Sequence, residues 1–159
     1  MAEQKNKLKI EDAILKHLDG DNKRLALGFV EYLRDNKINL AQGTNNGWKA
    51  ASKGKALLWV YIGNNWCVSP RLYSIDKHDD SKVDDAMKEL VWDNMYGCIP
   101  HCTKNCGSES KITIYGKELT RYCCATLDKR GLWVVNPDED KIKSIKKLLD
   151  VERQARMNV

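Results

Sequence analysis

Apolar residues at the start of the chain recur at helical spacing. One stripe predicts a short helix over 10–18, and a second stripe predicts a helix over 22–36 with its polar residues on the opposite side. Gly20 and Asp21 supply a stop for the first helix and an N-cap for the second. Residues 1–40 are therefore predicted to form a helical N-terminal segment.

The next region is built of short apolar and β-branched runs. Turn residues at Lys53–Gly54 and at Gly63–Asn65 divide the stretch 48–73 into three, which predicts an antiparallel meander of three strands. The middle run, 57–62, is apolar on both faces and should be central in the sheet. A helical stripe over 81–96 follows, so the order is strand, strand, strand, helix.

The same order returns after a cysteine-rich stretch at 98–110, and it predicts two βββα units, 46–97 and 111–157. The segment Trp66–Pro70 of the first unit also matches Trp133–Pro137 of the second, which suggests an internal duplication. The predicted elements of the second unit are strands at 112–115, 119–127 and 133–135, a turn at 116–117, and a helix over 138–156. The predicted fold is one α+β domain, 1–159, with an antiparallel sheet and a cysteine knuckle between the units.

Composition places the chain among ordinary soluble domains. It has 159 residues, of which 42% are apolar and 31% charged, and no apolar run long enough to span a membrane. No apolar segment of a secretion signal follows Met1–Lys9, so we expect a cytoplasmic protein with no membrane partner. The net charge of +5 is too small to predict nucleic acid as a partner.

The cysteines carry the clearest candidate chemistry. Thiols in the cytoplasm stay reduced, so clustered cysteines are interpreted first as metal ligands. Cys98, Cys102 and Cys106 follow one another at four-residue intervals, in a stretch whose proline and glycine predict an irregular loop around one point. Neighbouring side chains of a strand point to opposite faces, so only one of Cys123 and Cys124 should join them, and we predict Cys123. Four thiolates make a closed, structural zinc site.

Other fates of these cysteines stay open. The spacing is not that of the common paired zinc hooks, and three or four thiolates can also hold an iron–sulfur cluster or act as reactive thiols near His101. Whether Cys123 or Cys124 is the fourth ligand is equally open. Cys67 lies at an apolar strand position and is predicted to be a buried small hydrophobe. His17 and His78 have no obvious partner in the sequence.

Function is less constrained than fold. The chain contains no serine-histidine-aspartate set, glycine-rich phosphate loop or zinc-protease signature, so no catalytic residue is predicted and a non-enzymatic role is favoured. Trp48, Trp59 and Trp66 are expected chiefly to cover the sheet, although a cleft between the two units could bind a small molecule. The sequence thus predicts a zinc-stabilised small-molecule-binding or regulatory module, and the alternative is a thiol-dependent redox or metal-handling protein.

The cysteine knuckle, the hairpin Ile114–Leu119 and the helix start Asn136–Asp138 resemble a set of small uncharacterised bacterial proteins. The tryptophan-rich meander followed by a helix is similar, more loosely, to YdhG-like small domains, which lack this knuckle. The first resemblance covers about the last two-thirds of the chain. It implies no assigned activity, no substrate and no catalytic residue that could be transferred.

Overall fold

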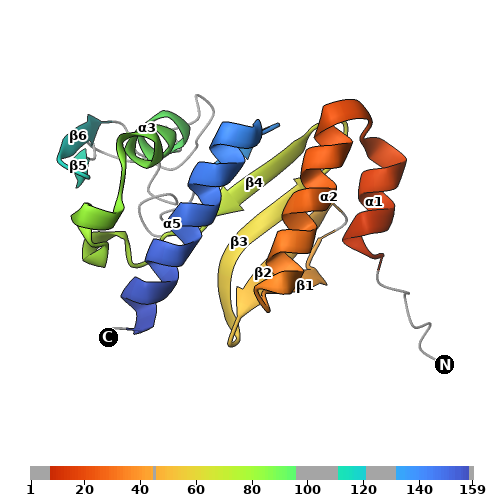
Figure 1. The fold of residues 1–159 in the computed structure, drawn as a ribbon, viewed down its shortest axis with the longest axis horizontal. Helices are drawn as coiled ribbons and strands as arrows, with labels where there is room; N and C mark the ends of the chain where they lie inside the picture. Colours follow the sequence, from red (N-terminus) through yellow and green to blue (C-terminus); the bar gives the residue numbers. More distant parts are fainter. Residues whose placement is uncertain (1–7, 45, 96–110, 121–131, 158–159) are drawn as a thin grey trace, which may run out of the picture. The chain divides into compact units, whose positions relative to one another are not determined.

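The computed structural model describes residues 8–44, 46–95, 111–120 and 132–157, which form an α+β fold of helices and antiparallel strands (Figure 1). In chain order the elements are α1 (Ile10–His17), α2 (Gly20–Asp35), β1 (Asn39–Gln42), β2 (Gly47–Ser52), β3 (Lys55–Ile62), β4 (Trp66–Pro70), the short 3-10 turns η1 (Ile75–Lys77) and η2 (Asp80–Lys82), α3 (Asp85–Asn94), β5 (Lys111–Ile114), β6 (Lys117–Thr120), β7 (Val134–Val135) and α5 (Glu139–Met157). Two compact units divide the chain. Unit 1 comprises 1–68 and 135–138, and unit 2 comprises 69–134 and 139–159.

Unit 1 packs helices α1 and α2 on one face of the β1–β3 sheet, as Figure 1 shows. The two helices follow the predicted apolar stripes, and Phe29 and Leu33 of α2 are almost fully buried. Trp48, Leu58 and Val60 of the sheet are buried as well, with exposed fractions of 2% or less. The two predicted helices and the strands of the predicted meander are therefore confirmed, whereas residues 39 and 40 of the predicted helical segment belong to β1. Burial of these side chains is the dominant stabilising term of the unit.

The strands of the sheet have the order β1-β2-β3-β4-β7. Antiparallel pairing sets Ala41 opposite Lys49 and Lys49 opposite Trp59, and a β-bulge interrupts the β2–β3 register after Ala50. The β2–β3 turn falls at Lys53 and Gly54, which both have positive φ (51° and 77°), as the two central residues of a tight hairpin turn require. Strand β1 was not predicted.

Unit 2 is built around two helices that pack together, α3 and α5. The side chain of Asp84 accepts a 2.9 Å hydrogen bond from the backbone N–H of Met87 and so fixes the start of α3. The predicted helix over 81–96 therefore begins later than expected, because residues 80–82 form η2 instead. The apolar stripe predicted for the last helix is buried in α5, where Ile145, Leu148 and Leu149 are inaccessible to solvent.

The internal duplication is not confirmed by the described strands. In the first predicted unit, β2, β3 and β4 are successive neighbours in one sheet, whereas β5 and β6 of the second form a separate two-stranded sheet and β7 joins β4. The hairpin turn lies at Tyr115 and Gly116, one residue earlier than predicted. The compact units also divide the chain at positions other than 46–97 and 111–157, and the single domain stays a prediction.

Candidate functional site

The predicted zinc ligands cannot be placed. Cys98, Cys102, Cys106 and Cys123, together with the alternative Cys124, lie outside the described residues. Within the described part of the chain, no three or more histidine, cysteine, aspartate or glutamate side chains are grouped to hold a metal ion. Cys67 is described, and its exposed fraction of 5% confirms the prediction that it is a buried small hydrophobe.

A buried carboxylate in unit 2 is the most unusual feature of the described residues. Glu152 lies on the apolar stripe of α5, seven residues after Ile145, and its exposed fraction is 0%. A buried ionised carboxylate is costly unless its oxygens are hydrogen-bonded. Here Oε1 accepts a 3.0 Å hydrogen bond from the backbone N–H of Ser74, and Oε2 accepts one from Nε of Arg156 on the next turn of the helix.

The third partner of Glu152 is the imidazole of His78. His78 Nε2 lies 3.0 Å from Glu152 Oε1, and His78 Nδ1 lies 2.7 Å from the hydroxyl oxygen of Tyr115. A carboxylate oxygen only accepts, so Nε2 carries a proton and Nδ1 is the nitrogen that faces the tyrosine. Three side chains, two of them 74 residues apart in sequence, are thus joined in one hydrogen-bonded chain, which we call the Glu-His-Tyr chain (Glu152, His78 and Tyr115).

Tyr115 reaches His78 from an unfavourable backbone conformation. It occupies the first central position of the β5–β6 turn with a φ of +50°, and Gly116 follows with +80°. Asparagine or glycine is the usual residue there, because a side chain of another type meets the following carbonyl. A hydrogen bond from α3 holds the turn in place, since Nε1 of Trp92 donates to the carbonyl of Ile114 at 2.8 Å.

The surroundings of Tyr115 in the Glu-His-Tyr chain keep its hydroxyl protonated. Burial raises the pKa of the Tyr115 hydroxyl well above its usual value near 10, and the negative charges of Glu152 and Asp80 raise this pKa further. Tyr115 therefore has a proton that it can donate to Nδ1 of His78.

The Tyr115 end of the Glu-His-Tyr chain lines a small polar pocket of about 260 Å³. All of its lining residues belong to unit 2. One wall comes from the η1–η2 segment and the other from the β5–β6 hairpin: Ile75, Asp76, His78, Asp80, Thr113, Ile114, Tyr115 and Gly116. The pocket thus combines two carboxylates, a hydroxyl group and an imidazole that is hydrogen-bonded to a buried glutamate.

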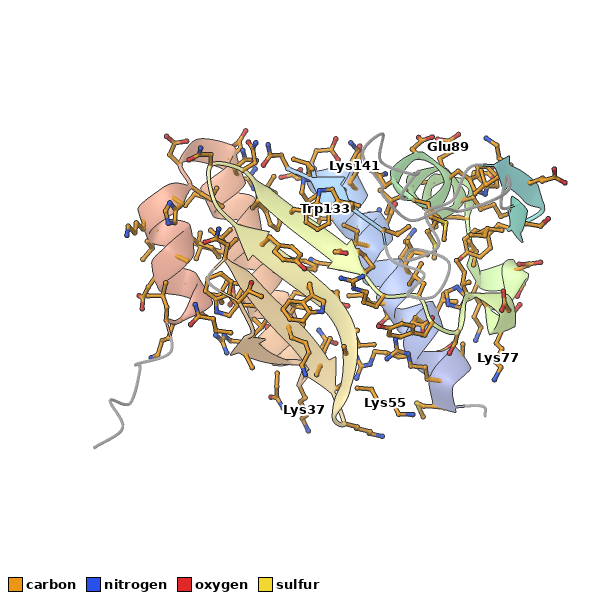
Figure 2. All side chains as sticks on the ribbon, turned by 180° about the vertical axis from the view of Figure 1, so that it is seen from behind. Lys37, Lys55, Lys77, Glu89, Trp133 and Lys141 are labelled. Carbon is orange, nitrogen blue, oxygen red and sulfur yellow. The ribbon has the colours of Figure 1, made fainter. Side chains whose placement is uncertain are left out.

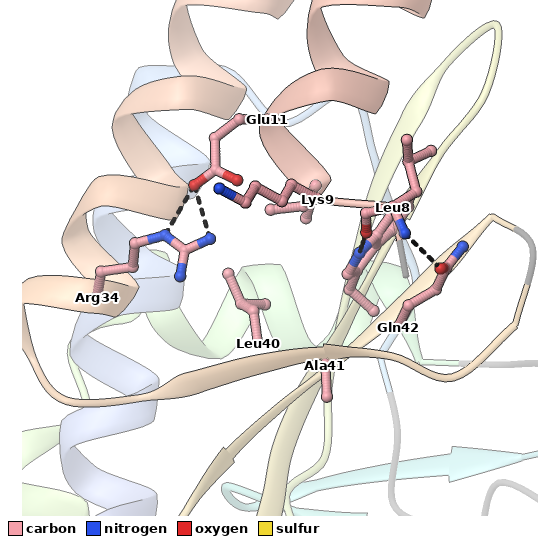
Figure 3. Close-up of a pocket in the computed structure, with 9 residues that line it drawn as sticks. Leu8, Lys9, Glu11, Arg34, Leu40, Ala41 and Gln42 are labelled. Carbon is pink, nitrogen blue, oxygen red and sulfur yellow. Dashed lines mark hydrogen bonds and ion pairs between the residues drawn. The ribbon is translucent and has the colours of Figure 1, made fainter. Parts of the chain in front are cut away.

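Unit 1 contains a larger pocket of about 670 Å³, shown in Figure 3. Nε and a terminal nitrogen of Arg34 each donate a 2.7 Å hydrogen bond to one carboxylate oxygen of Glu11 across it. Residue Leu8 closes another side, since its N–H donates to Gln42 and its carbonyl accepts from Nε1 of Trp48. The Glu11 and Arg34 side chains are 33% and 48% exposed, so their charges interact mainly with each other and with water.

Sequence reasoning missed the Glu-His-Tyr chain because its members are far apart. A signal was nevertheless present. Glu152 falls on the stripe of α5 that otherwise holds apolar residues, and a carboxylate at such a position requires buried donors.

Comparisons with protein families, with curated proteins and with solved structures find no match to this chain. The resemblance to small bacterial proteins therefore stays a prediction from the sequence. No helix among residues 8–44, 46–95, 111–120 and 132–157 is both long and apolar enough to cross a membrane.

Proposed function

We propose that the protein is a small-molecule-binding module and that its ligand occupies the polar pocket of unit 2. The observation that carries this proposal is the Glu-His-Tyr chain, which ends at the pocket wall. A buried glutamate and a strained tyrosine both cost stability, and such costs concentrate at sites where they serve binding or chemistry. Local preference does not favour either residue, since an apolar side chain is usual on the buried stripe of a helix and asparagine or glycine at this turn position.

The lining favours a small, polar, positively charged ligand. The side chains of Asp76 and Asp80 lie on one wall, and the carboxylate of Asp80 is close enough to Tyr115 to raise the pKa of its hydroxyl. An ammonium group placed between these oxygens would offset their negative charge, and the Tyr115 hydroxyl would orient the rest of the molecule. We therefore infer that the ligand is a small amine.

Trp92 offers a reporter for this binding. Its indole donates to the carbonyl of Ile114, the residue before Tyr115, so a ligand at the hairpin turn changes its surroundings. Protein labelled with 5-fluorotryptophan is titrated with a panel of small amines and their uncharged analogues, and the Trp92 fluorine resonance is assigned with Trp92→Phe. We expect some amines, and not their uncharged analogues, to shift this resonance.

The matched controls are two acidic residues. Asp80→Asn should weaken the binding roughly 2- to 10-fold, as expected for removal of one partly solvated charge. Asp93→Asn, which changes an exposed residue of α3 outside the pocket, should leave the affinity unchanged. The proposal is contradicted if no amine in the panel shifts the Trp92 resonance, or if Asp80→Asn leaves the affinity for the amine unchanged.

Zinc is the second part of the proposal, and it rests on cysteine spacing alone. Cys98, Cys102, Cys106 and Cys123 would hold one structural ion, which contributes to folding free energy but leaves no open position for a substrate. Elemental analysis should find one equivalent of zinc, lost in Cys102→Ser and kept in Cys67→Ala. Fast-reacting thiols in a metal-free protein would favour the thiol-dependent alternative, and iron would indicate a cluster.

A further inference from the structure

One stretch of unit 1 contains basic residues and no acidic ones. Residues 36–68, which include β1 to β3, contain four lysines and no aspartate or glutamate. Four of the five excess positive charges of the whole chain therefore lie in this segment. The lysines are Lys37, Lys49, Lys53 and Lys55, and all four are exposed.

Side-chain alternation assigns the sheet two different faces. Trp48, Leu58 and Val60 are buried on the face that α1 and α2 cover. Lys49 and Trp59, which are paired across β2 and β3, lie on the other side, and we call this side the outer face: Ala41, Lys49, Trp59 and Tyr61. Figure 2 views the sheet from this side, with Lys37 and Lys55 at the end where β2 turns into β3.

Two aromatic side chains lie next to each other on the outer face. The rings of Trp59 and Tyr61 are 6.1 Å apart between centroids, and their planes differ by 15°. Each ring also approaches a glycine closely. A Cβ at Gly43 would be 2.5 Å from a ring carbon of Trp59, and a Cβ at Gly47 would be 2.9 Å from a ring carbon of Tyr61. Only a glycine leaves room for these ring atoms, so the two rings are held along the outer face, and both stay partly exposed.

The geometry points to the outer face as a binding surface for single-stranded nucleic acid. Such surfaces combine aromatic side chains, on which bases stack, with basic groups that follow the phosphate backbone. The partly exposed rings of Trp59 and Tyr61 supply the first feature. Lys49, paired with Trp59 across the strands, and the lysines at the β2–β3 end of the sheet supply the second. Acidic side chains, which would repel phosphates, are confined in the described part of unit 1 to α1, α2, their flanking residues and Asp138. A small net charge for the whole chain conceals this uneven distribution.

Binding of the intact protein to fluorescently labelled oligouridylate and oligothymidylate is measured by anisotropy. We expect the affinity to fall about 20-fold between about 50 mM and about 200 mM salt, as when three phosphates are neutralised. Replacing an aromatic ring on which a base stacks weakens binding roughly 5- to 150-fold, so Trp59→Leu should do the same. The RNA and DNA arms show which sugar is preferred, and a preference in either direction supports the proposal.

Two lysine pairs provide a test that does not depend on the folding of the tryptophan variant. Lys49→Gln/Lys53→Gln should weaken binding and flatten its salt dependence, whereas Lys16→Gln/Lys143→Gln removes equal charge from exposed helix positions and should change neither. The proposal is overturned by absence of binding at the lower salt concentration, by equal effects of the two lysine pairs, or by equal affinity for duplex. Equally effective competition by polyglutamate would indicate an acidic protein partner instead and would also overturn it.

Discussion

Replacing Glu152 with alanine tests whether the Glu-His-Tyr chain exists as described. The substitution removes the acceptor for Nε2 of His78, the backbone N–H of Ser74 and Nε of Arg156 at once. It also relieves the cost of burying a carboxylate, so the three bond energies do not simply add. Breaking a buried ion pair by removing one partner costs about 3–5 kcal/mol, and we expect a loss in that range for Glu152→Ala.

The assay is urea denaturation combined with hydrogen exchange. With a slope of about 2 kcal/mol per molar urea, the midpoint should fall by roughly 1.5–2.5 M. Because the chain has two compact units, exchange of peptides from α3 and α5 is needed to follow unit 2 separately. These peptides should lose protection in the variant.

Asp150→Ala is the matched control, since Asp150 is exposed two residues earlier on the same helix. A surface substitution of this kind is expected to change stability by no more than about 0.5 kcal/mol. If Glu152→Ala also cost less than about 1 kcal/mol, its carboxylate would not be the buried acceptor for three donors, and the reasoning would fail.

Substitutions at three further positions test the structure. The raised pKa of Tyr115 keeps its hydroxyl protonated in the folded protein. The stability that Tyr115 contributes is therefore complete below about pH 10 and is lost as the pH rises further. Denaturation above about pH 10 should reveal a smaller loss of stability with pH in Tyr115→Phe than in the unaltered protein. Asp84 caps α3 and is paired with Lys147 at 2.9 Å, and both bonds lower the pKa of its carboxyl group. Asp84→Ala should therefore cost about 1 kcal/mol of stability near neutral pH and less below about pH 4. Asp84→Asn should retain most of the cap. Gly43→Ala places a Cβ too close to the rigid ring of Trp59, and a melt should show a loss of about 1–3 kcal/mol together with altered tryptophan fluorescence.

Local pattern was sufficient to predict most of the fold. The helices of unit 1, the β2–β4 meander and α5 all follow hydrophobic periodicity, which reflects burial of one face. Strand β1 was missed because Asn39, Ala41 and Gln42 have little intrinsic preference for strands and pair through their position beside β2. The β5–β6 turn was predicted one residue too late because tyrosine is not a usual turn residue.

The candidate site was beyond the reach of local pattern, because it depends on contacts between distant segments. Nothing near His78 in sequence identifies Glu152 or Tyr115 as its partners. What the sequence does contain is two exceptions to ordinary preference, a glutamate on an apolar stripe and a tyrosine before a turn glycine. Both exceptions meet at the same histidine, and such conflicts between local preference and tertiary structure are expected at functional sites.

Tyr115→Asn separates a structural from a functional reason for the second exception. Asparagine suits the left-handed turn position and should relieve about 1–2 kcal/mol of backbone strain. Loss of a half-buried ring and of the hydrogen bond to His78 should cost about 1.5–3 kcal/mol, so the net loss is about 2 kcal/mol at most and centres on about 1 kcal/mol. Tyr115→Phe keeps the strain and most of the ring burial, and it should cost about 0.5–1.5 kcal/mol.

The two variants should therefore have similar stability by urea denaturation while both lose affinity for the amines that shift the Trp92 resonance. A role confined to packing gives a different pattern, because Tyr115→Asn would then be far less stable than Tyr115→Phe, and Tyr115→Phe would bind as well as the unaltered protein. That second pattern would assign the tyrosine to the structure of the hairpin and would remove the main support for a ligand in this pocket.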